Sequence, residues 1–199
     1  MKNIYKISLI IFFVVLVFTN CENANKKTTD DINEKVPQQD YLKKGKEMAM
    51  AAQTVLAKNL MAAINSGGTT GALSFCNVRA LPLTDSTAVV LNAKIKRVSD
   101  RNRNVGNAAN ASELAYIQQA KLSVKDLGSE KPMLHEINNE MVGYYPIMTN
   151  GLCLKCHGDP SRDIDDATYS LIKDKYPNDK AIGYLANELR GIWVINMDK

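Results

Sequence analysis

Apolar residues recur at steps of three and four between residues 40 and 66, and this spacing predicts a long amphipathic helix. The residues with this spacing are Met48, Ala52, Val55, Leu56, Leu60, Ala63 and Ile64. Gly67 and Gly68 follow directly and are expected to end the helix. A second helix is predicted over 72–80. It should stop ahead of Pro82, because a residue that precedes proline disfavours the α region.

The rest of the chain alternates between helical and extended patterns. The expected elements are a helix over 84–91, a strand over 93–98, an Asn-rich loop over 100–110, a helix over 111–121, a hairpin over 132–147, a short helix over 165–173 and a strand over 191–197. Helices that precede a mostly antiparallel sheet indicate the α+β class.

The N-terminus has the pattern of a secretory signal peptide. Lys2 and Lys6 accompany an apolar run over 7–18, which is too short to span a bilayer and is typical of a signal-peptide core. We therefore predict a signal peptide over 1–20. No further domain is needed, since the chain of 199 residues has room for one ordinary domain after this extension.

The residues 17–20 that precede Cys21 resemble a lipobox, the tract after which bacterial lipoproteins are cut and acylated. Lipidation of Cys21 is expected, and ordinary soluble export is the alternative. Residues 21–37 are almost entirely polar and predict a flexible tether. A folded domain over 38–199 would then be anchored at the periplasmic or extracytoplasmic face of a bacterial membrane.

Net charge excludes one class of partner. The full chain carries +4, and removal of residues 1–20 with their two lysines lowers this to +2. A nearly balanced charge, together with an export signal, argues against nucleic acid as a partner. The membrane, reached through the lipid anchor, is the expected partner surface.

The run Cys153-Leu154-Lys155-Cys156-His157 is the strongest chemical signal in the chain. Two thiols three positions apart can each form a thioether with one vinyl group of haem, and the next residue then brings an imidazole to the iron. We predict one covalent haem c, attached at Cys153 and Cys156 and ligated by His157.

Two other interpretations of the motif remain open. With Cys76, the motif has the ligands of a tetrahedral Cys3His zinc site. A C-x-x-C pair can also form a redox disulfide of the thioredoxin type. The segment 148–151 does not have the strand-to-helix pattern that a thioredoxin motif requires.

Four stretches in order resemble a family of exported c-type haem-binding domains with a PAS-like fold, long catalogued as a domain of unknown function. These stretches lie within 72–80, 97–107, 145–158 and 176–191, and the resemblance covers residues 40 to 197. Val105 and Ala109 depart from the family pattern, which has prolines at these positions, and Asn187-Glu188 replaces a Gly-Asp pair. The resemblance implies a PAS-like fold.

The resemblance also implies that Cys76 is the second axial ligand. Ferric iron lowers the pKa of a nearby thiol, and Cys76 is the cysteine without another predicted role. A buried free cysteine is the alternative interpretation of Cys76. Other distal-ligand candidates are His135, Met133, Met141 and Met148.

Arg103 is predicted to pair with a haem propionate, because guanidinium matches a carboxylate in a bidentate fork. A six-coordinate iron leaves no site for a substrate, so we expect no enzymatic activity. The predicted function is electron transfer or redox signalling with an unidentified redox partner. A haem-based redox or gas sensor is the alternative, which a PAS-like fold allows by analogy.

Overall fold

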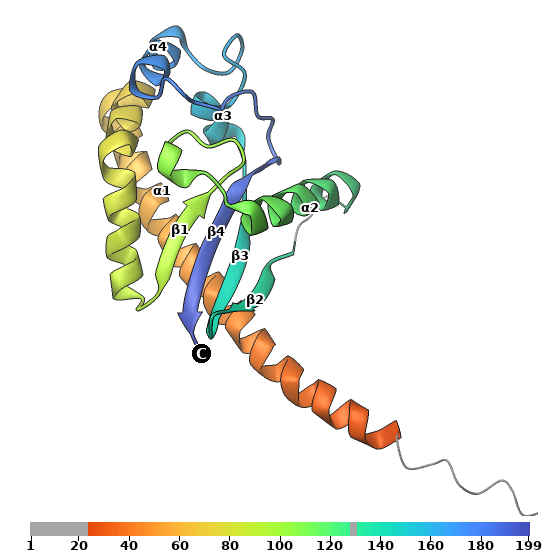
Figure 1. Ribbon diagram of the computed structural model, residues 1–199. Coiled ribbons are helices and arrows are strands. Elements are labelled where there is room, and N and C mark those ends of the chain that lie inside the picture. Colours follow the sequence, from red (N-terminus) through yellow and green to blue (C-terminus); the bar gives the residue numbers. More distant parts are fainter. Residues whose placement is uncertain (1–23, 128–130) are drawn as a thin grey trace, which may run out of the picture. The chain divides into compact units, whose positions relative to one another are not determined.

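The computed structural model describes residues 24–127 and 131–199 (Figure 1). Residues Asp40–Lys199 form a compact unit that contains a four-stranded sheet and its covering helices. This confirms the α+β class and is consistent with a PAS-like fold. The predicted signal peptide and Cys21 lie outside the described residues. Among those that are described, no helix is both long and apolar enough to cross a membrane.

Helix α1 (Ala24–Val90) is broken by a kink at Gly67 and Gly68. Gly68 has a φ of 64°, a left-handed conformation that glycine adopts without steric cost. The kink confirms the predicted end of the first helix and divides α1 into two helical halves.

The second half of α1 continues through Pro82 to Val90, so the predicted stop ahead of proline is wrong, and so is the separate helix over 84–91. Proline inside a helix costs about 3 kcal/mol. Ala80 and Leu83, on either side of it, pack against the hydrophobic core, and this burial opposes the local penalty. The Thr84 hydroxyl also donates to the Ala80 carbonyl at 2.9 Å.

Residues 24–37, predicted to be a flexible tether, are helical in the structure. The tether was predicted because a polar segment gains little free energy from burial. The helical backbone includes Pro37, a residue that is unfavourable inside a helix.

The antiparallel sheet has the order β1-β4-β3-β2. Its strands are β1 (Lys94–Val98), β2 (Met133–Ile137), β3 (Glu140–Met148) and β4 (Leu189–Asp198). Asn138 and Asn139 form the turn between β2 and β3 with φ of 51° and 64°. The predicted hairpin and both other strands are therefore confirmed.

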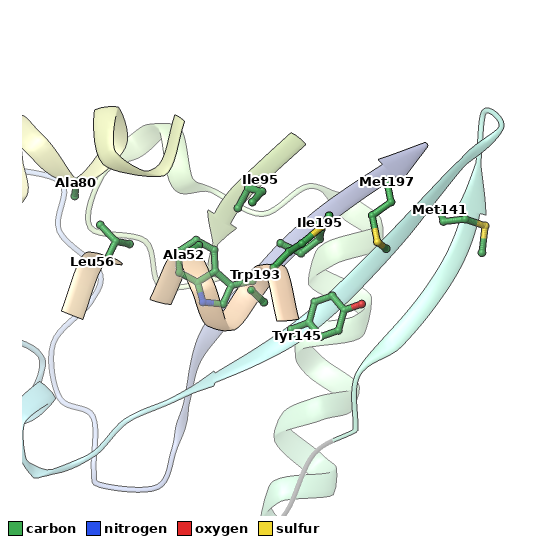
Figure 2. Close-up of a cluster of buried hydrophobic side chains, with 11 residues drawn as sticks. Ala52, Leu56, Ala80, Ile95, Met141, Tyr145, Trp193, Ile195 and Met197 are labelled. Carbon is green, nitrogen blue, oxygen red and sulfur yellow. The ribbon is translucent and has the colours of Figure 1, made fainter. Parts of the chain in front are cut away.

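Each face of the sheet packs against a helix. Figure 2 shows Ala52 and Leu56 of α1 beside Trp193 and Ile195 of the central strand β4. On the other face lies α2 (Ala111–Leu127), whose fully buried Ile117 packs in a second cluster. The predicted helix over 111–121 is thus confirmed and extends six residues further, to Leu127.

Short elements join the sheet to the second half of α1 at one end of the unit. They are the 3-10 helix η1 (Val105–Asn107), α3 (Gly151–His157) and α4 (Asp166–Lys175). Asp165 caps α4 by accepting from the Thr168 amide at 2.9 Å, which confirms the predicted short helix. Leu73 of α1 packs against Ile172 of α4 and fixes this end of the unit.

Candidate functional site

A cavity of about 330 Å³ lies among α1, β1, the loop that contains η1, and α3. Cys76, Cys153, Cys156 and His157 all line it, although Cys76 is far from the others in the sequence. The structure therefore brings together the four residues predicted to attach and ligate a haem. Apolar side chains of α1, among them Leu56, Leu60 and Leu73, form much of the wall.

Helix α3 presents the two cysteines of the motif to this cavity. Its N-cap is Asn150, whose Oδ1 accepts from the Leu152 amide at 3.0 Å and from the Cys153 amide at 3.3 Å. Positions three apart lie on one face of a helix, so Cys153 and Cys156 point to the same side. An asparagine cap thus sets the start of the helix that carries the motif.

Gly158 ends α3 directly after His157. Its amide donates to the Leu154 carbonyl at 2.9 Å. A Cβ at this position would lie 2.6 Å from the side chain of Asp163 and 2.7 Å from the Leu154 oxygen. Only glycine allows this close approach, which holds the end of α3 against the loop that follows.

The ring of His157 is held by the Ala181 carbonyl, 2.7 Å from Nδ1. Because a carbonyl only accepts, Nδ1 carries the proton and Nε2 keeps its lone pair. Burial, followed by the charges of Arg190 and Arg103, lowers the pKa of His157 well below its usual value. The imidazole is therefore neutral and suited to bind a metal through Nε2.

Cys76 is half-buried in the second half of α1. Burial raises the pKa of its thiol, while the charges of Arg97 and Arg103 act in the opposite direction. Burial also raises the pKa of Cys156, again opposed by Arg103. Cys76, Cys153 and Cys156 are free thiols in the structure.

The zinc interpretation is not supported by the arrangement of these side chains. Within residues 24–127 and 131–199, no group of three or more His, Cys, Asp or Glu side chains is close enough to hold a metal ion. Cys76 shares the cavity with the motif without forming a tetrahedral cluster with it.

Among the other distal-ligand candidates, Met148 lines the cavity. His135 lies on β2, is exposed, and contacts Tyr144 in a tilted arrangement with ring centroids 5.5 Å apart. Met141 is buried in the core with α1, and Met133 packs on the α2 face. Met61 of α1 also lines the cavity and was not singled out from the sequence.

Arg103 lines the cavity and ties α3 to the loop that precedes β4. Its Nη2 donates to the Cys156 carbonyl at 2.6 Å and forms a buried ion pair with Asp179 at 2.9 Å. The same Nη2 donates to the Ala181 carbonyl at 3.3 Å, the carbonyl that also accepts from His157. The predicted propionate partner thus already has a carboxylate partner in the protein.

Arg97 and Arg190 also line the cavity, and sequence analysis did not assign a function to either. One signal was available for Arg97. Strand alternation places it on the same face of β1 as Ile95, which is buried against α1, so a charged residue occupies an inward position. Arg190 carries no comparable signal in the sequence.

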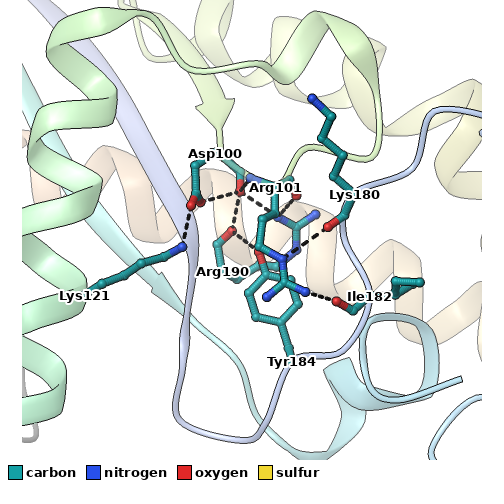
Figure 3. Close-up of polar contacts among 8 residues, drawn as sticks. Asp100, Arg101, Lys121, Lys180, Ile182, Tyr184 and Arg190 are labelled. Atoms are coloured by element: carbon teal, nitrogen blue, oxygen red, sulfur yellow. Dashed lines mark hydrogen bonds and ion pairs between the residues drawn. The ribbon is translucent and has the colours of Figure 1, made fainter. Parts of the chain in front are cut away.

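Figure 3 shows how Arg190 is anchored. Its Nη1 donates to Ser99 Oγ at 3.0 Å and to the Arg101 carbonyl at 3.1 Å. The Arg101 guanidinium stacks on the Tyr184 ring at 4.0 Å and donates to the carbonyls of Lys180 and Ile182. These contacts join the loop after β1 to the segment that holds His157.

Comparison with protein-family models matches residues 20–197 to the Tll0287-like family, described as Tll0287. A solved structure, the cyanobacterial heme-protein Tll0287, is similar to this chain with a TM-score of 0.53 and 18% sequence identity. The similarity covers 75% of this chain and 92% of that one, and at this identity it is a likeness of fold. A search of curated proteins finds no match.

Proposed function

Because the chain belongs to the Tll0287-like family, we propose that it binds one covalent haem c in the cavity and acts in electron transfer. The observation that carries this proposal is the neutral His157, whose Nδ1 is already engaged, in one cavity with Cys153 and Cys156. The structurally similar cyanobacterial Tll0287 is a heme-protein, which supports the same cofactor here.

The residues present fit such a group. Two thiols on one face of α3 can form the two thioethers, and apolar side chains of α1 match the faces of a porphyrin. Buried Nε atoms of Arg103 and Arg190 have no hydrogen-bond partner in the described part of the chain, which suits a ligand that carries carboxylates. When bound, haem supplies a reversible one-electron couple at iron.

Cys76 is proposed as the second residue that would hold the haem iron, together with His157. It enters the cavity from α1, whereas His157 enters from α3, so the two side chains come from separate elements. The positive charges of Arg97 and Arg103 favour the thiolate, and burial disfavours it. A metal charge in the cavity would add to the effect of the arginines.

If His157 and Cys76 both held the iron of the oxidised protein, no iron position would be left for a substrate, which favours electron transfer over catalysis. The purified, matured protein is expected to be reduced and reoxidised as a single one-electron couple, measured by potentiometric titration of its optical spectrum. The titration curves from repeated cycles of reduction and oxidation should superimpose. Irreversible loss of the spectrum after one cycle would argue against a carrier.

The protein is further proposed to be an exported lipoprotein, attached to a bacterial membrane through Cys21, which lies outside the described residues. The support is the apolar run over 7–18 and the lipobox-like residues that precede this cysteine. Mass spectrometry of the native N-terminus should find Cys21 as the first residue, carrying diacylglycerol. An unmodified Cys21 in the mature protein would contradict the lipid anchor and favour ordinary secretion.

A further inference from the structure

We propose that Arg97 and Arg190, rather than Arg103, bind the two propionate carboxylates of the haem. This inference rests on the proposed function, since it assigns protein partners to a group that the proposed cofactor carries. It replaces Arg103, whose charge Asp179 already neutralises, with two arginines that form no ion pair with a carboxylate in the described residues.

Arg97 lines the cavity and has no carboxylate partner among the described residues. Its guanidinium carbon lies 5.6 Å from the centre of the Trp193 ring, and Arg97 forms no hydrogen bond or ion pair with the described residues. Burial lowers the pKa of this guanidinium. Arg97 is half-buried and has no carboxylate partner, so a carboxylate in the cavity would give its guanidinium a bidentate counter-charge.

Arg190 has donors left after its protein contacts. Nη1 is used by Ser99 and by the Arg101 carbonyl, while Nε is buried without a partner in the described residues. No carboxylate in this part of the protein forms an ion pair with it. The Nη1 contacts fix the guanidinium in place, so that a carboxylate would meet a positioned donor.

The charges of the cavity match a ligand with two carboxylates. Arg97, Arg103 and Arg190 line it, and no aspartate or glutamate in the described residues does. Asp179 neutralises Arg103. Lys155 also lines the cavity but is exposed, and water can solvate its charge. The half-buried guanidiniums of Arg97 and Arg190 remain without a carboxylate partner, one for each of two propionates.

The test compares Arg97→Met and Arg190→Met with Arg79→Met in the matured protein. Arg79 is an exposed arginine on the same helix as Cys76 and does not line the cavity, so it controls for the loss of a charge. Loss of a cation beside the haem stabilises the ferric state. Each cavity variant should raise the equilibrium ratio of ferric to ferrous protein about tenfold, which lowers the midpoint potential by about 59 mV. Arg79→Met should leave this potential unchanged.

Resonance Raman bands of the propionates separate a direct contact from a distant charge. They should shift in Arg97→Met and Arg190→Met and stay unchanged in Arg79→Met. Arg97→Lys should recover most of the potential, since it keeps the charge, while its propionate band remains shifted because lysine lacks the bidentate fork. If Arg190→Met fails to fold, Arg190→Lys gives the same band measurement.

Unchanged bands and potentials in both cavity variants, with haem still covalently attached, would overturn the inference and leave the proposed function intact. In that case, shifted bands in Arg103→Met would return the role to Arg103. A wild-type protein that carries no covalent haem would overturn the proposed function itself, and this inference with it.

Discussion

Cys76→Ala is expected to abolish the low-spin thiolate electron paramagnetic resonance signal of the ferric protein. The side chain of Cys76 lines the same cavity as His157, and the other cysteines there are assigned to thioethers. Alanine is the best helix former, so the substitution should leave α1 intact and remove the sulfur alone. The measurement is the ferric spectrum of wild type and variant at one pH.

Met148→Leu is the matched control for this variant, because Met148 also lines the cavity and leucine keeps its apolar bulk. The control should retain the wild-type spectrum. Coincident spectra for wild type and Cys76→Ala would make Cys76 a packing residue. A changed spectrum in Met148→Leu would then make Met148 the ligand, since His135 lies away from the cavity.

Reduction should weaken the bond to Cys76. Reduction of a bound haem would remove a positive charge from the iron, so the thiolate would keep only the charges of Arg97 and Arg103 to oppose the cost of its burial. The ferrous wild-type protein is therefore expected to bind CO, and optical titration measures this. CO binding would be compatible with the sensor hypothesis as well as with electron transfer. Failure of the ferrous protein to bind CO would contradict the expected weakening and would support electron transfer only.

Local signals in the sequence were sufficient to predict most of the helices and strands of the fold. Gly67 and Gly68 mark the kink in α1, and the Asn138-Asn139 pair forms the β2–β3 turn. The capping box at the start of α2 is also formed, since the Asn110 amide donates to Glu113 Oε2 at 2.8 Å and the Glu113 amide donates to Asn110 Oδ1 at 3.0 Å. Each of these features depends on residues close together in the chain.

The errors arise where distant packing outweighs a local preference. Pro82 lies inside a helix because its neighbours on that helix are buried against a sheet formed by later residues. The sequence also did not predict α3, whose start depends on the Asn150 cap and whose end depends on contacts with Asp163 and the 181–184 segment.

The sequence predicted which cysteines and histidine share the site, but it did not predict which arginines there have a carboxylate partner. The motif spacing and the resemblance identified the residues that share the cavity. The Asp179 partner of Arg103 lies 76 positions away in the sequence, so neither this pair nor the unpaired state of Arg97 could be inferred from the chain. Charge compensation in a buried site depends on tertiary contacts that no short pattern records.

The most direct test of the account is the intact mass of the unfolded protein after expression with cytochrome c maturation. Thioethers to Cys153 and Cys156 survive denaturation, whereas axial bonds to His157 and Cys76 do not. Cys153→Ser/Cys156→Ser keeps both axial ligands and controls for haem that is bound without thioethers. Wild type should retain one haem after acid acetone extraction, and the double variant should lose all of it. Wild-type protein at the mass of its polypeptide alone would contradict the account.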